Sequence, residues 1–146
     1  MKLLFFLSGS HTYFAREEVI SLLDTYDIKY EITYNEGQLL LLNVNSSELD
    51  FLFRLGLTHF VLNVIIESYI DDGIEKILSD IEWSSYLNLD RTFKVRVKHK
   101  DSSFENLELL IAKSISKYFR DKIKADLSNP MDEINGILYG KRLIIG

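Results

Sequence analysis

The chain has 146 residues, of which 47% are hydrophobic and 27% charged, a balance typical of a globular protein rather than a disordered one. It contains no cysteine, which excludes disulfides, thiolate nucleophiles and cysteine metal sites, and its three histidines lie too far apart in sequence for a metal-binding motif. Its apolar runs are far shorter than the about 20 residues of a membrane-spanning helix, so we expect a cytoplasmic protein without a membrane segment.

The net charge of −5 hides an uneven distribution along the chain. Residues 1–90 carry five basic and fifteen acidic side chains, a net charge of −10, whereas residues 91–146 carry twelve basic and seven acidic ones, a net charge of +5. The asymmetry indicates two domains with different partners, and the basic one is the candidate for binding a polyanion. The alternative is a chance distribution of solvated charge.

The first 70 residues are expected to form a ferredoxin-like domain. Apolar runs and helical spacing predict strand, helix, strand, strand, helix and strand over residues 2–7, 14–26, 30–34, 38–43, 48–53 and 58–69. Asn35-Glu36-Gly37 is typical of a hairpin turn, because Asn and Gly readily adopt positive φ. The order βαββαβ is the split βαβ pattern, so the fold class is α+β.

Asp71-Asp72-Gly73 marks the expected boundary, and residues 71–146 are predicted to form a second, α/β domain. Hydrophobic periodicity predicts a helix over residues 74–81, a strand over 92–100, a long helix over 104–123 and a terminal hairpin of strands 133–138 and 141–145.

Two sets of cations stand out in this second half. Lys94, Arg96, Lys98 and Lys100 alternate with Phe93, Val95, Val97 and His99, so they share one face of a strand and span about 20 Å, comparable with several phosphates. Lys113, Lys117, Arg120 and Lys124 recur at spacings of four, three and four, which places them on one face of the predicted helix. The alternative interpretation is a solvated sheet edge protected by lysines.

Motifs for catalysis are missing from the sequence. It has no nucleophile–base motif, no P-loop and no glycine-rich turn between a strand and a helix. Asn129-Pro130-Met131 lacks the second proline and the aromatic residue of the Asn-Pro-Pro-Tyr tetrapeptide of amino-methylating enzymes. We therefore expect this chain alone to be non-catalytic and to hold no metal.

Two motifs resemble known families. Residues 124–130, Lys-Ala-Asp-Leu-Ser-Asn-Pro, followed by a hairpin that ends in residues 141–146, resemble the end of a THUMP domain, except that Met131 stands where an acidic residue is usual and the acid is Asp132. Residues 4–11 and 54–59 are similar to the amino-terminal domain of archaeal tRNA guanosine-10 N2-methyltransferases. In those enzymes a ferredoxin-like domain and a THUMP domain precede a Rossmann-fold methyltransferase domain.

The resemblance implies a tRNA-binding region that docks tRNA, through its acceptor stem and 3′ end, for a C-terminal methyltransferase domain in cis. It also implies that S-adenosylmethionine belongs to that domain and that this chain is a truncated part or a stand-alone module. The candidate RNA-binding residues are Lys94, Arg96, Lys98, Lys100, Lys113, Lys117, Arg120, Lys124, Asn129, Lys141 and Arg142. The open alternatives are a THUMP module of a thiouridine or pseudouridine synthase and a stand-alone binding or dimerisation module.

Overall fold

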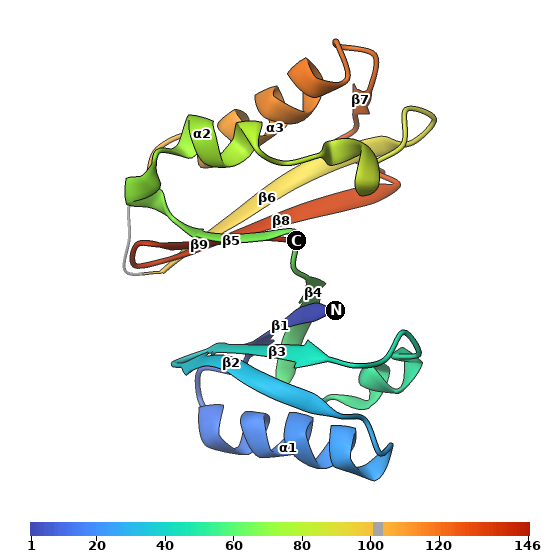
Figure 1. Ribbon diagram of the computed structural model, residues 1–146, viewed down its shortest axis with the longest axis vertical. Helices are drawn as coiled ribbons and strands as arrows, with labels where there is room; N and C mark the ends of the chain where they lie inside the picture. Colours follow the sequence, from blue (N-terminus) through green and yellow to red (C-terminus); the bar gives the residue numbers. More distant parts are fainter. Residues whose placement is uncertain (101–103) are drawn as a thin grey trace. The chain divides into compact units, whose positions relative to one another are not determined.

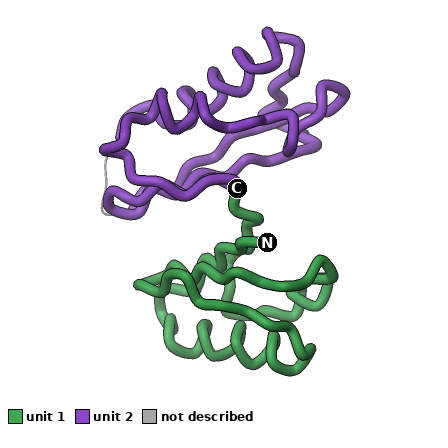
Figure 2. The backbone as a smooth tube through the Cα atoms, viewed as in Figure 1, with its two compact units in different colours: residues 1–64 green, residues 65–146 purple. Residues whose placement is uncertain are grey.

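The computed structural model describes residues 1–100 and 104–146, which form two compact units, residues 1–64 and 65–146 (Figures 1 and 2). At the division, the N–H of Val64 donates to the carbonyl of Lys2 at 2.9 Å, and the N–H of Ile65 donates to the carbonyl of Ile145 at 2.7 Å. The single strand predicted over residues 58–69 is therefore wrong, because this segment forms two strands in two different sheets. Residues 65–70, assigned to the first domain from the sequence, lie in the second unit.

The first unit is a four-stranded antiparallel sheet with strand order β2-β3-β1-β4. Its elements are β1 (Lys2–Leu7), α1 (Thr12–Thr25), β2 (Tyr30–Glu36), β3 (Leu39–Val44), the 3-10 helix η1 (Asp50–Arg54) and β4 (Thr58–Asn63). The predicted hairpin is confirmed, with Gly37 at a φ of 56° between β2 and β3. The predicted ferredoxin-like order is likewise confirmed, with a 3-10 helix in the place of the second helix.

One face of this sheet packs against α1. The core consists of Leu3, Phe5 and Leu7 of β1, Ala15, Val19 and Leu23 of α1, and Leu40, Leu42 and Val44 of β3. The carboxylate of Glu18 on α1 accepts the N–H groups of Gly56 and Leu57 at 2.8 and 2.9 Å. This contact ties α1 to the start of β4.

The helix predicted over residues 48–53 is instead the short 3-10 helix η1. Both ends of the connection are fixed, since the N–H of Asn45 donates to the carbonyl of Lys29 and Gly56 is held by Glu18. A 3-10 helix rises about 2.0 Å per residue against 1.5 Å for an α-helix, so it covers the distance with fewer residues.

The second unit is a five-stranded mixed sheet with strand order β5-β9-β8-β6-β7. Strand β6 pairs in parallel with β7 and β8, and the other pairs are antiparallel. Figure 1 shows α2 and α3 on one face of this sheet. The elements are β5 (Ile66–Tyr69), η2 (Ile70–Asp72), α2 (Ile74–Ser79), η3 (Trp83–Ser85), β6 (Thr92–Lys100), α3 (Leu107–Tyr118), β7 (Lys124–Ala125), β8 (Asp132–Tyr139) and β9 (Arg142–Ile145). In the described part of the chain, no helix is both long and apolar enough to cross a membrane.

Helix α3 packs on the middle of this sheet. Its residues Leu107, Ile111 and Ile115 are buried, and their spacing of four places them on one face of the helix. Below them the sheet carries Gly136, and a methyl group on this residue would lie 3.0 Å from Cγ2 of Val97 and 3.4 Å from Cδ1 of Ile111. The missing side chain therefore allows the helix to approach β6 and β8 closely.

Helix α3 ends five residues before the predicted end. After Tyr118 the chain turns through Arg120 and Asp121, whose φ angles of 53° and 58° are left-handed and incompatible with a continuing helix. The N–H of Asp121 donates to the carbonyl of Ser116 at 2.8 Å and closes the helix end. Ile123 is nevertheless buried, but from the loop rather than from the helix.

The space at Gly136 gives a first prediction. Gly136→Ala is expected to lower the free energy of unfolding by about 1–3 kcal/mol, because the added methyl group overpacks the contact between α3 and the sheet. Gly56→Ala is the matched control, since its methyl group would meet only the movable Oε1 of Glu18, at 3.4 Å. Urea denaturation measures both, and an equal loss in the two variants would contradict the close-packing account.

Candidate functional site

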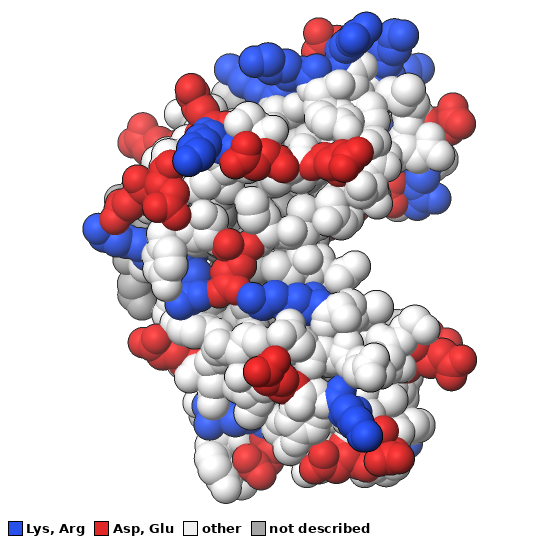
Figure 3. Space-filling model, viewed as in Figure 1, with Lys and Arg blue, Asp and Glu red and all other residues white. Residues whose placement is uncertain are grey.

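The outer side of α3 and the turn after it carry a continuous group of cations. Lys113 and Lys117 lie opposite the buried stripe of α3, and Arg120, Lys122 and Lys124 follow in the turn and in β7. All five side chains are exposed. Figure 3 shows Lys and Arg gathered over α3 and the turn that follows it. We call these five residues the α3 cationic face.

The backbone after α3 determines where these side chains point. Arg120 and Asp121 adopt left-handed conformations, which cost free energy for residues other than glycine. The turn is held by hydrogen bonds from the N–H of Asp121 to Ser116 and from the N–H of Lys122 to the carbonyl of Phe119, at 2.8 and 3.1 Å. Because the chain leaves the helix here, Lys122 is exposed beside the four residues that helical spacing had grouped. Helical spacing alone did not include Lys122 in the predicted cationic group.

The side chains of the α3 cationic face have no partners within residues 1–100 and 104–146. None of the five side chains makes a hydrogen bond, an ion pair or a ring contact there. Their charges are therefore not neutralised by neighbouring carboxylates. Such a group of unpaired cations creates a positive potential that attracts polyanions.

The strand cations lie elsewhere. Phe93 and Val95 of β6 are buried against the helices, so the alternate residues Lys94 and Arg96 project from the opposite face of the sheet. Lys94 donates to the carbonyl of Leu127 at 3.0 Å, and Nε of Arg96 lies 3.7 Å from Oε1 of Glu133. Lys98 and Lys100 follow by the same alternation, and Nζ of Lys100 lies 5.5 Å from the centre of the Tyr139 ring. The structure thus places the strand set and the helix set on opposite faces of the sheet.

The two cations of the last hairpin join strands. Lys141 pairs with Asp71 at 2.6 Å, and the Asp71 carboxylate raises the pKa of Lys141 by hydrogen bonding and by charge. Arg142 pairs with Glu67 of β5 and donates to the hydroxyl of Tyr69 at 2.8 Å. These contacts connect β9 and its turn to β5 and the following segment.

The Asp-Leu-Ser-Asn-Pro element, residues 126–130, forms the loop between β7 and β8. Oδ1 of Asp126 accepts the N–H groups of Ser128 and Asn129, both at 2.9 Å, and its own N–H donates to the carbonyl of Phe93 at 2.9 Å. The two backbone donors hold the pKa of Asp126 below its usual value. The side chain of Asn129 is exposed at the end of this turn.

Asp132 closes the same loop through Arg91. Nε of Arg91 donates to Oδ2 of Asp132 at 2.7 Å and Nη2 donates to Oδ1 at 2.8 Å, a bidentate pair. Nη2 also donates to the carbonyl of Met131 at 3.0 Å. The bidentate Asp132 carboxylate raises the pKa of Arg91. Asp132, which stands one position later than the acidic residue usual after the proline, thus has a structural role as the partner of Arg91.

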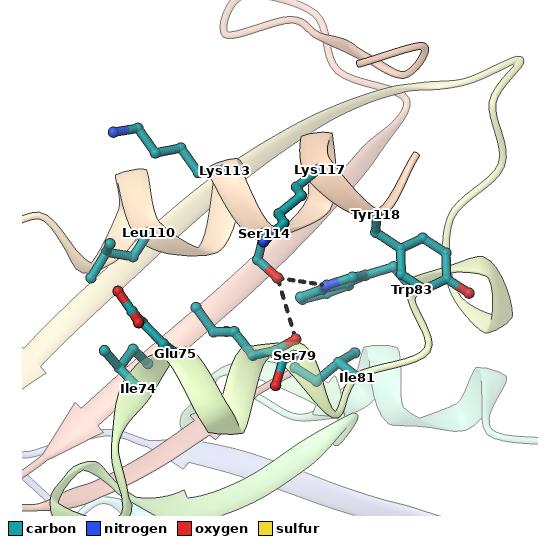
Figure 4. A pocket seen from close by; sticks show the side chains of 11 residues that line it. Ile74, Glu75, Ser79, Ile81, Trp83, Leu110, Lys113, Ser114, Lys117 and Tyr118 are labelled. Atoms are coloured by element: carbon teal, nitrogen blue, oxygen red, sulfur yellow. Dashed lines mark hydrogen bonds between the residues drawn. The ribbon is translucent and has the colours of Figure 1, made fainter. Parts of the chain in front are cut away.

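A groove of about 530 Å³ lies between α2 and α3 (Figure 4). Trp83 is fully buried beside it, and its Nε1 donates to Oγ of Ser114 at 3.2 Å, which in turn donates to the carbonyl of Leu78 at 3.3 Å. Tyr118 is 41% exposed at the rim. The sequence analysis did not predict this groove, because Trp83 lies in an aperiodic segment and its partner Ser114 is distant in sequence. In the described ranges, 1–100 and 104–146, no three His, Asp or Glu side chains gather as a metal-binding group.

The sheet order and the two helices define a mixed α/β unit, and its family is shown by sequence. The model of the THUMP domain matches residues 70–145, more than half of the chain, so the chain belongs to the THUMP domain family. No curated protein matches the chain at significant similarity.

Solved structures share the fold over nearly the whole chain. A predicted N6-adenine-specific DNA methylase from Listeria monocytogenes is 16% identical, with a TM-score of 0.69, and the match covers 99% of this chain and 39% of that one. TrmN from Thermus thermophilus is 13% identical, with a TM-score of 0.66, over 100% of this chain and 45% of that one. A 4-thiouridine synthetase in a complex with RNA and ATP is 13% identical, with a TM-score of 0.58, over 99% and 40%. The chain therefore spans less than half the length of each.

The Asp126 turn gives a second prediction. Asp126→Ala is expected to lower the thermal midpoint at neutral pH, because two backbone N–H groups lose their acceptor. Since the pKa of Asp126 is lower in the folded than in the unfolded chain, its contribution is fully present above an unfolded pKa of about 4 and is lost as the pH falls through the folded pKa. The difference in Tm between wild type and variant should therefore shrink below about pH 4.

Asp126→Asn serves as the control, because the amide oxygen can still accept both N–H groups. It should lose less stability than Asp126→Ala at neutral pH. A Tm difference that stays constant from neutral to acid pH in Asp126→Ala would contradict the role of the ionised carboxylate.

Proposed function

We propose that this chain is the tRNA-binding region of an S-adenosylmethionine-dependent tRNA methyltransferase that acts on the N2 atom of guanosine 10. Its part is to dock tRNA, through the acceptor stem and 3′ end, for a catalytic Rossmann domain in cis. The single observation that carries RNA binding is the α3 cationic face, five exposed cations without partners in the described ranges of a THUMP-family chain.

The geometry of this face suits a phosphate backbone. Helix α3 has 12 residues, which at 1.5 Å each gives about 18 Å, enough to lie along several phosphates. Lys113 and Lys117 are one turn apart, and Arg120, Lys122 and Lys124 continue the line beyond the helix. A convex helix with flexible cations contacts phosphates rather than base edges, so the RNA is recognised by its shape and not by its sequence.

In this proposal the acidic first unit does not contact the RNA directly. Residues 1–64 carry few cations, so phosphates are not attracted to most of this unit. It acts as a structural support, and the second unit provides the contacts. The methyl transfer itself and the S-adenosylmethionine belong to the domain in cis. The methylase and TrmN chains that share the fold are more than twice as long as this chain, which leaves room for such a domain.

A second candidate is the RNA-binding region of a thiouridine synthase. It is favoured by the fold shared with the 4-thiouridine synthetase in its RNA complex. The two candidates differ in the sequence that follows residue 146 in the gene. A Rossmann segment with an Asn/Asp-Pro-Pro-Tyr motif supports methylation, and a P-loop-like pyrophosphatase segment supports thiolation.

Charge reversal on the α3 cationic face tests RNA binding. Arg120→Glu with Lys124→Glu is expected to weaken tRNA binding at least tenfold at low salt and to flatten the slope of log K against log salt by about two, because two phosphate contacts are lost. Lys29→Glu with Lys76→Glu makes the same change in net charge at exposed positions outside this face. Filter binding over a salt series measures both, and equal losses would show that only net charge matters.

The strand cations are tested separately. Arg96→Glu with Lys98→Glu is expected to weaken tRNA binding, but less than the reversal on the α3 cationic face, because Arg96 already shares its charge with Glu133. The two faces lie on opposite sides of one sheet, so a rigid duplex contacts one of them at a time. A loss equal to or greater than that of the helix variant would move the RNA to the strand face.

A further inference from the structure

Strand β6 has an open edge along most of its length. Its neighbour on that side, β7, is only two residues long and pairs with Thr92 and Phe93. The chain turns away after Ala125, so residues 94–100 of β6 have no strand partner on this side within the described part of the chain. A long strand with one open edge is a template for pairing with another extended segment.

The hydrogen bonds of β6 show which backbone groups face this edge. The carbonyl of Phe93 accepts the N–H of Asp126 on the β7 side, at 2.9 Å. Backbone groups of successive residues alternate between the two sides of a strand, so Val95 and Val97 also direct theirs to the open edge. One donor is covered, because the N–H of Val97 donates to Oε1 of Glu108 on α3 at 2.8 Å. In the described ranges, both backbone groups of Val95 and the carbonyl of Val97 can still pair with a further strand.

A second groove, of about 430 Å³, lies along this edge. Phe93, Val95 and Leu107 line its inner side, and Leu109 of α3 and Leu127 after β7 line its outer side. We call it the β6 edge groove. Leu109 is 50% exposed and Leu127 is 72% exposed, and neither belongs to the buried core or packs against it. Exposed leucines beside an open strand edge are typical of a surface that binds a protein segment.

A strand added at this edge would have two different faces. Its side chains on the helix side would meet the apolar groove, where a carboxylate would lie beside Glu108. Its side chains on the other face would lie next to Lys94 and Arg96, which project from β6 away from the helices. Opposite charges on adjacent strands stabilise a sheet, and like charges destabilise it. The matching segment is therefore apolar at the positions that face α3 and acidic at the positions between them.

Charge disfavours two other occupants of the edge. A second copy of β6, paired antiparallel, would place its own cations beside Lys94 and Arg96 on one face of the joined sheet. A phosphate backbone has no alternating N–H and C=O groups to pair with the edge, and the Glu108 carboxylate repels it.

We propose that the open edge of β6 binds an extended acidic segment of a protein partner by strand addition. The segment pairs its backbone with Val95 and Val97, and its apolar side chains fill the β6 edge groove. Its acidic side chains lie beside Lys94 and Arg96. This surface goes beyond RNA binding and uses none of the residues of the α3 cationic face.

The test uses a labelled synthetic peptide of alternating valine and glutamate, as long as the open part of β6. One control peptide carries methyl groups on the backbone nitrogens that would pair with β6, and another has lysine in place of glutamate. By fluorescence anisotropy, the first peptide is expected to bind the chain at least about tenfold more tightly than either control. Its binding should also slow amide hydrogen exchange at Val95, because this N–H gains an acceptor.

Leu109→Ser with Leu127→Ser removes the two exposed leucines of the groove without changing charge or core. This double variant is expected to weaken binding of the valine–glutamate peptide about tenfold. Ile32→Ser with Leu89→Ser is the matched control, since each of these side chains is 46% exposed and lies outside the groove. It should bind the peptide as wild type does.

Equal binding of the methylated peptide to wild type overturns strand addition, and equal binding of the lysine peptide overturns the acidic partner. Absence of peptide binding, or an equal loss in the two double variants, overturns the proposal as a whole. Light scattering and tRNA filter binding cover the other occupants. If wild type is a dimer that the Leu109→Ser and Leu127→Ser variant dissolves, the occupant is a second copy. If that variant weakens tRNA binding as strongly as peptide binding, the occupant is RNA, and either result overturns the proposal. None of these results changes the outcome of charge reversal on the α3 cationic face, so the proposed function is tested separately.

Discussion

The close contact of α3 with the sheet above Gly136 is the constraint on which the second unit depends. Because residue 136 has no side chain, Ile111 and Val97 can both lie close to its backbone, and the helix packs close to β6 and β8. The buried stripe of α3 fixes the rotation of the helix about its axis, and the opposite side must face solvent. Lys113 and Lys117 are exposed for this reason. The part of the cationic surface that α3 carries is therefore a consequence of core packing, whereas Arg120, Lys122 and Lys124 are placed by the turn and by β7.

The most family-specific residues of the chain build architecture rather than a binding surface. The carboxylate of Asp126 accepts hydrogen bonds from backbone N–H groups of its own loop. The carboxylate of Asp132 accepts hydrogen bonds from Nε and Nη2 of Arg91. These contacts hold the return of the chain from β7 to β8 beside the start of β6. A motif is conspicuous when its backbone geometry allows few substitutions. A phosphate-binding surface needs only cations without partners, and several sequences can supply them.

Periodicity predicted the elements whose stabilising contacts repeat along the chain. The β2–β3 hairpin, the alternation in β6 and the burial of Ile111 and Ile115 on α3 were correct for this reason. The break between β4 and β5 was missed because the β-branched and aromatic pattern continues across it, while the hydrogen-bond partners, Lys2 and Ile145, lie far away in sequence. The end of α3 was missed because Arg120 and Asp121 take left-handed conformations that glycine or asparagine usually signals. Trp83 lies in an aperiodic segment, and its burial depends on a distant residue, Ser114.

The candidate cations were recognisable from sequence, but their partners were not. A lysine or arginine with a carboxylate beside it must exchange that partner for a phosphate, and exposed pairs are worth about 0–1 kcal/mol each. Arg96 and Lys141 have such partners, and the α3 cationic face has none in the described ranges. The free-energy cost of exchanging a carboxylate for a phosphate is thus small for each paired cation. The cations of the α3 cationic face do not have this cost, because they have no carboxylate partner in the described ranges.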